Sequence, residues 1–137
     1  MNVYSMNNKQ LKELTKIAHF MESVIYETDN CVRDFNILTQ QQVNKTTFLE
    51  FALMFFERKT WEIVEMLEFD TNEFILLNEV NETLDSVMKE TESVYHYSVT
   101  DENGEHYHTT DRKGHIIGIL EWALDQIVGN IDIEQTI

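Results

Sequence analysis

Two pairs of acidic residues are spaced so that they could bind a metal ion together. Glu62 and Glu65 form one pair, and Glu82 and Asp85 form the other, with sixteen residues between the pairs. In a helix, residues three apart lie on one face, so each pair presents two carboxylates together. Two such helices packed antiparallel could hold Mg²⁺, which takes oxygen ligands. The spacing therefore indicates a candidate magnesium site.

This pattern resembles the metal site of the all-α nucleoside triphosphate pyrophosphatases, the MazG-like family, over about residues 58–90. The resemblance implies a nucleotide phosphate as substrate and four Mg²⁺ ligands: Glu62, Glu65, Glu82 and Asp85. Enzymes of this class need basic groups near the phosphates, and Lys89 is the only Lys or Arg between residues 60 and 110. We therefore hold an Mg²⁺-dependent pyrophosphatase as an alternative function.

A second candidate for metal chemistry is a group of four histidines within twenty residues: His96, His106, His108 and His115. An Asn103-Gly104 turn between two β-rich runs would place Asp101 opposite His106, and Val99 opposite His108. Asp101, His106 and His108 are then candidate Zn²⁺ ligands. Nearby acids favour protonated histidine, which opposes metal binding. Our principal prediction therefore includes no metal and no cofactor.

The third candidate is an acidic surface for binding a partner protein. Its members are solvent-facing carboxylates on two predicted helices and at a predicted hairpin tip: Glu62, Glu65, Glu68, Glu79, Glu82, Asp85, Asp101, Glu102 and Glu105. Rows of carboxylates on rigid helices can imitate the charges of a nucleic-acid backbone, and long-range attraction would steer them toward a basic groove. An ordinary solvated acidic surface would show the same pattern.

The distribution of charge favours this third candidate. The 137-residue chain carries a net charge of −15, with 25 acids against 10 Lys and Arg. Residues 1–59 carry seven acids and seven bases, whereas residues 60–110 carry thirteen acids and one base. Clustered like charges repel each other and lower the stability of the fold. We therefore expect the cluster of acids to have a function. The same charge argues against direct binding to nucleic acid.

Hydrophobic periodicity predicts one mainly α (α+β) domain of about four helices, with one β-hairpin before the C-terminal helix. Residues 29–45 fit a short helix or an extended segment, and Ile131, Ile133 and Ile137 could add a strand or fray. The predicted helices span about 8–28, 46–69, 73–93 and 116–128, and the strands 94–99 and 106–110. Gly129 and Asn130 are expected to cap the last helix. The predicted domain covers residues 1–137, with a neutral half at 1–59, an acidic middle at 60–110 and a C-terminal helix at about 115–128.

From Phe48 to Phe56 every residue except Glu50 is apolar. A helix of this kind is buried on all sides or covered by a partner. We expect the first, and a homodimer through the Phe48–Phe56 helix is the alternative. The lone Cys31 allows no internal disulfide, favours a reducing compartment and lacks a neighbour that would make it a nucleophile.

We therefore expect a cytoplasmic, non-enzymatic inhibitor or regulator, because no signal peptide and no membrane-spanning apolar run is present. Its expected partner is a nucleic-acid-binding protein with a basic groove, and it would have no contact with membranes. Phage-encoded inhibitors of host nucleases and transcription proteins are similar in size and acidity, which suggests a role in anti-defence or host takeover. A dimeric structural or accessory protein is the third function class.

Overall fold

The computed structural model describes residues 6–90, 92 and 94–131 of the chain. Within this part, five helices and a two-stranded antiparallel hairpin follow one another: α1 (Asn8–Tyr26), α2 (Thr28–Thr39), α3 (Lys45–Val64), α4 (Asn72–Lys89), β1 (Val94–Asp101), β2 (Gly104–Asp111) and α5 (Arg112–Asn130). The predicted class, a mainly α single domain with a hairpin before the last helix, is confirmed.

Four of the helices begin at a side chain that caps them. Asn7, Asn44, Thr71 and Asp111 each accept a hydrogen bond from the backbone N–H three residues later, at 2.8–3.3 Å. Such a bond satisfies one of the unpaired donors in the first turn of a helix and stabilises it by about 1 kcal/mol. These polar residues therefore fix where α1, α3, α4 and α5 start.

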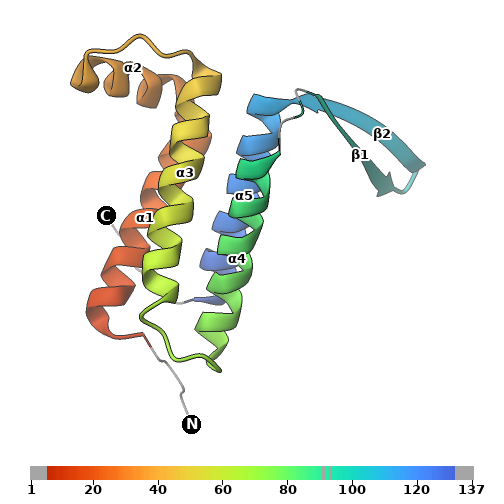
Figure 1. The fold of residues 1–137 in the computed structure, drawn as a ribbon. Coiled ribbons are helices and arrows are strands. Elements are labelled where there is room, and N and C mark those ends of the chain that lie inside the picture. Colours follow the sequence, from red (N-terminus) through yellow and green to blue (C-terminus); the bar gives the residue numbers. More distant parts are fainter. Residues whose placement is uncertain (1–5, 91, 93, 132–137) are drawn as a thin grey trace.

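Helices α1, α3, α4 and α5 pack side by side as a bundle, and α2 lies across one end of it (Figure 1). The predicted apolar stripes of α1, α4 and α5 face the centre, where most of their residues are buried. The interior is dominated by large side chains with almost no exposure, among them Leu14, Met21, Phe56, Leu84 and Leu120. Burial of these side chains is the main force that holds the bundle together.

Residues 29–45, whose structure the sequence left open, form most of α2. The break between α1 and α2 falls at Glu27 (φ −130°, ψ 42°), slightly before the end of the first predicted helix at about residue 28. The helix ends at Thr39, because Gln40 adopts a left-handed conformation with φ of 56° that helices do not continue through. Of the two alternatives left open for residues 29–45, a short helix is therefore the one present.

Helix α3 ends at Val64, not near Phe69 as predicted. The next backbone bonds, from Met66 and Leu67, reach back only three residues and tighten the turn. This tightening directs Leu67 into the core, where it is buried. Val64 and Leu67 are buried, but Met66 and Phe69 are exposed, so the segment after α3 is a turn that buries only some of its apolar residues.

The remaining helix ends also differ from prediction. Helix α4 stops at Lys89, four residues early, and α5 begins at Arg112, four residues before the predicted start at Ile116. The Asp111 cap explains the earlier start. Gly129 and Asn130 lie inside α5 and do not cap it. Of the predicted C-terminal strand, Ile131 is buried beside the bundle, whereas Ile133 and Ile137 lie outside the described residues.

The hairpin is present, but its predicted register is wrong. Val99 pairs with His106 and Tyr97 with His108, whereas Asp101 lies opposite Gly104. The two central loop residues are therefore Glu102 and Asn103, one position earlier than expected. The Asp101 carboxylate accepts a 2.7 Å bond from the Asn103 N–H, and Gly104 follows with φ of 107°, a conformation that favours glycine.

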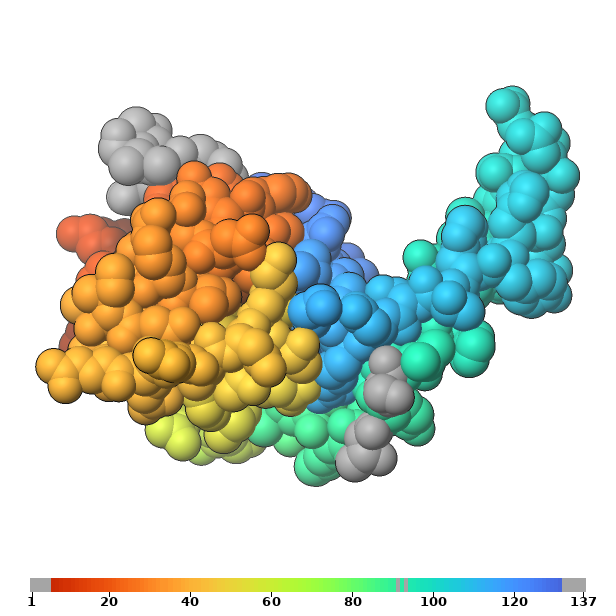
Figure 2. Space-filling model, turned by 90° about the horizontal axis from the view of Figure 1, so that it is seen from above, coloured from red at the N-terminus to blue at the C-terminus, as the bar shows by residue number. Residues whose placement is uncertain are grey.

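The hairpin projects from the bundle as a thin arm (Figures 1 and 2). We call β1 and β2, Val94–Asp111, the arm. Every strand residue of the arm is exposed except Tyr95 and Thr110, which are half-buried where it meets α5. The arm has two faces open to solvent for most of its length. A two-stranded hairpin in this position gains little stability from burial.

The apolar segment Phe48–Phe56 is not buried on all sides, which corrects the expectation from sequence. Five of its residues are buried, but Phe51, Met54 and Phe55 remain 42–49% exposed. The buried residues Leu49, Leu53, Phe56, Thr60 and Ile63 recur at three- and four-residue steps, so the rest of the fold covers one side of α3. No helix in the described part of the chain is both long and apolar enough to cross a membrane.

Candidate functional site

The nine predicted partner-binding acids are almost all on the surface. Eight are exposed, and Asp85 is half-buried. They form three groups: Glu62, Glu65 and Glu68 at the end of α3 and just beyond it; Glu79, Glu82 and Asp85 along α4; and Asp101, Glu102 and Glu105 at the tip of the arm. The arm leaves the bundle at the end opposite the α3–α4 connection (Figure 1). The acids are therefore distributed along the length of the molecule and do not form one flat face.

Three of the nine acids have a basic partner nearby. Glu62 lies 3.5 Å from Lys59, Asp85 lies 2.7 Å from Lys89, and Asp101 lies 3.2 Å from His106. A hydrogen bond from Lys89 to Asp85 raises the pKa of that lysine. Among the residues that the structure describes, no ion pair is formed by the other six: Glu65, Glu68, Glu79, Glu82, Glu102 and Glu105. These six carboxylates keep their charge available for a partner.

The four candidate Mg²⁺ ligands are not brought together. The side chain of Asn81 on α4 donates a 2.7 Å hydrogen bond to the backbone carbonyl of Glu57 on α3, which fixes how the two helices align. Glu82 then lies level with about residue 56, so the Glu62 and Glu65 pair is displaced by roughly 9 Å or more along the helix axes. Within residues 6–90, 92 and 94–131, no three His, Cys, Asp or Glu side chains could hold a metal ion together.

The arm places two of the four clustered histidines, His106 and His108, on one face, whereas His96 lies on the other face of the arm and His115 on α5. Tyr95, Tyr97 and Val99 share that face with His106 and His108, because residues two apart on a strand point the same way. The His108 ring stacks on Tyr97, with ring centroids 5.4 Å apart. His106 contacts Asp101 diagonally across the turn. Asp101 and His106 are therefore in contact, but His108 stacks on Tyr97, and the three predicted zinc ligands do not form a group that could hold a metal ion.

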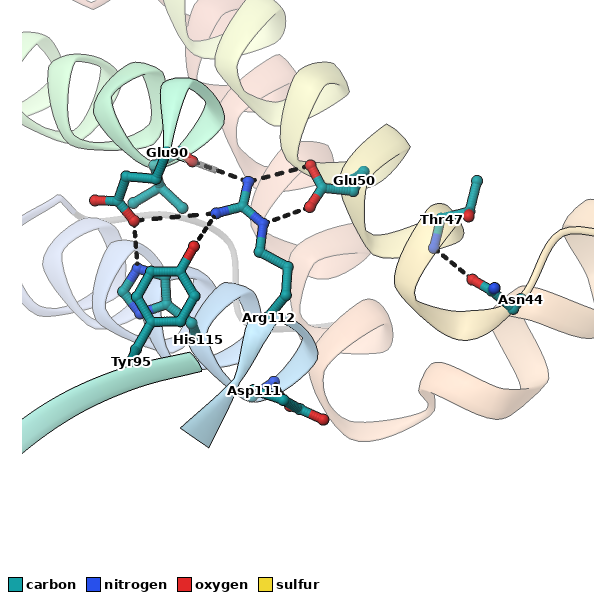
Figure 3. A network of polar contacts seen from close by, with 10 residues as sticks. Asn44, Thr47, Glu50, Glu90, Tyr95, Asp111, Arg112 and His115 are labelled. Atoms are coloured by element: carbon teal, nitrogen blue, oxygen red, sulfur yellow. Dashed lines mark hydrogen bonds and ion pairs between the residues drawn. The ribbon is translucent and has the colours of Figure 1, made fainter. Parts of the chain in front are cut away.

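Sequence reasoning missed the polar network that joins the arm to the bundle (Figure 3). Arg112, at the start of α5, has a side chain only 12% exposed and forms a two-pronged ion pair with Glu50 of α3. It also donates to the Tyr95 hydroxyl at 2.8 Å and to the Val87 backbone carbonyl at 2.9 Å. The hydrogen bond with Glu50 is the main reason that the pKa of Arg112 is raised well above its ordinary value.

His115 extends this network from the next turn of α5. Its ring stacks flat on Tyr95, with centroids 3.8 Å apart, and its Nε2 lies 3.0 Å from a carboxylate oxygen of Glu90. The same Glu90 oxygen is 4.0 Å from Arg112. One signal in the sequence pointed here: Glu50 is the only polar residue from Phe48 to Phe56, and a carboxylate among apolar residues needs a cation.

A cleft of about 390 Å³ opens beside this stack, between the base of the arm and α5. Tyr95, Tyr97 and Thr110 line it from the arm, and His115 and Ile119 line it from α5. Gly114 lets the arm approach, because a Cβ there would lie 2.0 Å from the Thr110 hydroxyl oxygen. The cleft is largely apolar and could accept a side chain from a bound protein.

Cys31 lies half-buried on α2. Burial raises the pKa of its thiol, and the nearby carboxylates of Glu27 and Asp34 raise it further. A nucleophilic cysteine needs the opposite shift, because the thiolate is the reactive form. The raised pKa therefore gives no support to a nucleophilic role for Cys31.

No protein-family model, curated protein or solved structure matches this chain. The resemblance to the pyrophosphatases accordingly rests on the two acid pairs alone.

Proposed function

We propose that this protein is a non-enzymatic inhibitor or regulator that binds the basic groove of a nucleic-acid-binding protein through the acids of α4 and the arm. One observation supports the proposal: Glu79 and Glu82 on α4 and Glu102 and Glu105 on a slender projection are exposed and form no ion pair with the described residues. Such carboxylates can pair with Lys and Arg of a partner without first breaking internal ion pairs, which favours binding.

The spacing of these acids suits imitation of a nucleic-acid backbone. Glu79, Glu82 and Asp85 are three residues apart, which is about 4.5 Å along a helix axis. Phosphates on one DNA strand repeat every 3.4 Å or so along the duplex axis. A rigid helix of carboxylates thus presents charges at a comparable interval. The target side chains that bind phosphates could bind these carboxylates instead.

The shape of the arm supports the same function. Each strand has 8 residues and is about 26 Å long, so the tip acids Asp101, Glu102 and Glu105 stand well away from the bundle. A narrow projection of this kind can enter a groove that a helical bundle cannot (Figure 2). The net charge of −15 would steer the approach. The phage-like and anti-defence roles expected from size and acidity belong to this proposal, as does a cytoplasmic location.

The first experiment is capture of partners from nuclease-treated cell lysate with the tagged protein, eluted in steps of rising salt. The captured protein is then purified and tested against duplex DNA. We expect it to bind either this chain or DNA, but not both together, and to leave this chain as salt rises. Simultaneous binding of DNA and this chain would contradict the proposal.

Charge-reversal variants locate the binding surface. The triple variant Glu79→Lys, Glu82→Lys, Glu102→Lys should bind the captured protein at least tenfold more weakly and with a flatter salt dependence. The matched control reverses three exposed acids in the neutral half: Glu13→Lys, Glu22→Lys and Glu27→Lys. Both variants change the net charge equally, so equal loss of affinity would show that the acidic middle has no special role. Circular dichroism checks that both remain folded.

A further inference from the structure

The outer side of α3 is apolar where a surface helix is normally polar. Phe51, Met54, Phe55 and Trp61 are each 42–49% exposed, and Phe20 of α1, at 40%, contacts Phe55 with ring centroids 5.5 Å apart. We call these five residues the aromatic patch. A helix exposes polar residues on the side away from the core unless something covers that side. We therefore expect a binding partner to cover the patch.

The charge around the patch indicates what the occupant is. The patch lies almost wholly within residues 1–59, where acids and bases balance, whereas residues 60–110 are strongly acidic. Two copies that approached through the acidic half would repel each other. Two copies that meet through the neutral half bring no large like charges together. The patch is thus the part of this acidic molecule that is best suited to self-association.

The side chains beside the patch are compatible with contact between two copies. Arg58 is exposed three residues after Phe55 on α3 and forms no ion pair with the described residues. Lys59 pairs with Glu62 and lies 5.7 Å from the centre of the Phe55 ring. The rim therefore carries both signs of charge in small number. A two-fold interface places each surface against a copy of itself, and a rim with both signs can satisfy that arrangement.

The exposed area is adequate for a dimer. An aromatic side chain buries about 150–250 Å² when it is fully covered, so five large side chains that are two-fifths to one-half exposed offer on the order of 400 Å² of apolar surface. A standard interface buries about 800 Å² on each partner, and rather more than half of that is apolar. The patch supplies most of this apolar share before any neighbouring residue contributes.

From these observations we infer that the aromatic patch is the interface of a two-fold homodimer, with a second copy of this chain as the occupant. The two copies contact each other through α3 and the adjoining part of α1. The acidic α4 and the arm remain outside the interface. The inference does not depend on the proposed function, because it uses a different surface and a different force.

Sedimentation equilibrium of the full chain tests the inference across a range of concentrations, at low and at moderate salt. We expect a dimer whose dissociation constant falls or stays constant as salt rises, because salt screens the repulsion between two copies. Phe55→Glu should weaken the dimer at least tenfold. The matched control Phe69→Glu changes the same residue type at an exposed position outside the patch and should dimerise normally.

A second variant covers the case in which Phe55→Glu disturbs the fold. Met54→Glu lies in the patch, is 49% exposed and should also weaken the dimer at least tenfold. A monomer at every concentration would overturn the inference. So would a dimer that dissociates as salt rises, or one that Phe69→Glu weakens as much as Met54→Glu does.

Discussion

The neutral half (residues 1–59) and the acidic middle (residues 60–110, called the acidic half below) expose surfaces of opposite character on one small bundle. In the neutral half, the outer side of α3 presents aromatic rings and few charges. In the acidic half, α4 and the arm present carboxylates, and six of the nine predicted binding acids have no ion-pair partner among the described residues. The first surface suits association through the hydrophobic effect, and the second suits attraction to a basic protein. Salt distinguishes the two kinds of association, because it weakens only the electrostatic attraction to a basic protein.

The two halves are joined by Arg112. This side chain pairs with Glu50 from the neutral half and bonds to Tyr95 and the Val87 carbonyl from the acidic half. The difference between the halves thus concerns their outer surfaces, while the interior forms one unit.

Two neighbouring phenylalanines should differ sharply in their effect on stability. Phe56→Ala should lower the free energy of unfolding by about 3–5 kcal/mol, because Phe56 is fully buried. Phe55→Ala should cost only about 1 kcal/mol in the monomer, since the ring is 42% exposed and loses mainly its aromatic contacts. Urea unfolding at a concentration where the chain is monomeric measures both. Equal losses would mean that the patch is part of the core.

Loss of the contacts that Arg112 makes between the two halves should lower the free energy of unfolding nearly as much. Arg112→Ala leaves Glu50 without its cation and removes a donor from Tyr95, so we expect a loss of about 2–4 kcal/mol. The control Arg33→Ala removes an exposed arginine that pairs only with its neighbour Asp34, and should cost less than about 0.5 kcal/mol. Thermal unfolding compares them. Similar values for the two variants would show that the network does not join the halves.

The smallest effect concerns the point where the arm meets α5. A hydrogen bond from the Gly114 N–H, supported by Lys113, lowers the pKa of Asp111 below its ordinary value of 3.8. The unfolded chain therefore binds a proton at this carboxyl more readily than the folded chain. The stabilisation by Asp111 is complete above its unfolded pKa and is lost as pH falls through the lower folded pKa.

Asp111→Asn isolates this contribution, because asparagine caps a helix without titrating. The difference in Tm between the wild-type chain and this variant should shrink as pH falls from about 5 to below the folded pKa. All other acids are common to both proteins and cancel in the comparison. A difference that stays constant over this range would contradict the role assigned to the Asp111 carboxylate.

The candidate site was predictable in part. The exposed positions of Glu62, Glu82 and Glu102 follow from helix periodicity and turn composition, which are local properties. The register of the hairpin was not predictable from the Asn-Gly pair, because the bond from the Asn103 N–H to Asp101 moves the turn by one residue. That shift changed the residues that face His106.

The class of fold, the buried stripes of α1, α4 and α5, and the concentration of acids in residues 60–110 were all predictable from the amino-acid sequence. These features depend on the order of residue types along the chain, and apolar periodicity specifies a buried face wherever the helix packs. The tertiary structure alone decided that Glu50 meets Arg112 across 62 positions, that the Mg²⁺ ligand pairs lie apart, and that one side of Phe48–Phe56 stays open. Each of these depends on how helices align and how many neighbours cover a face, which no local pattern encodes.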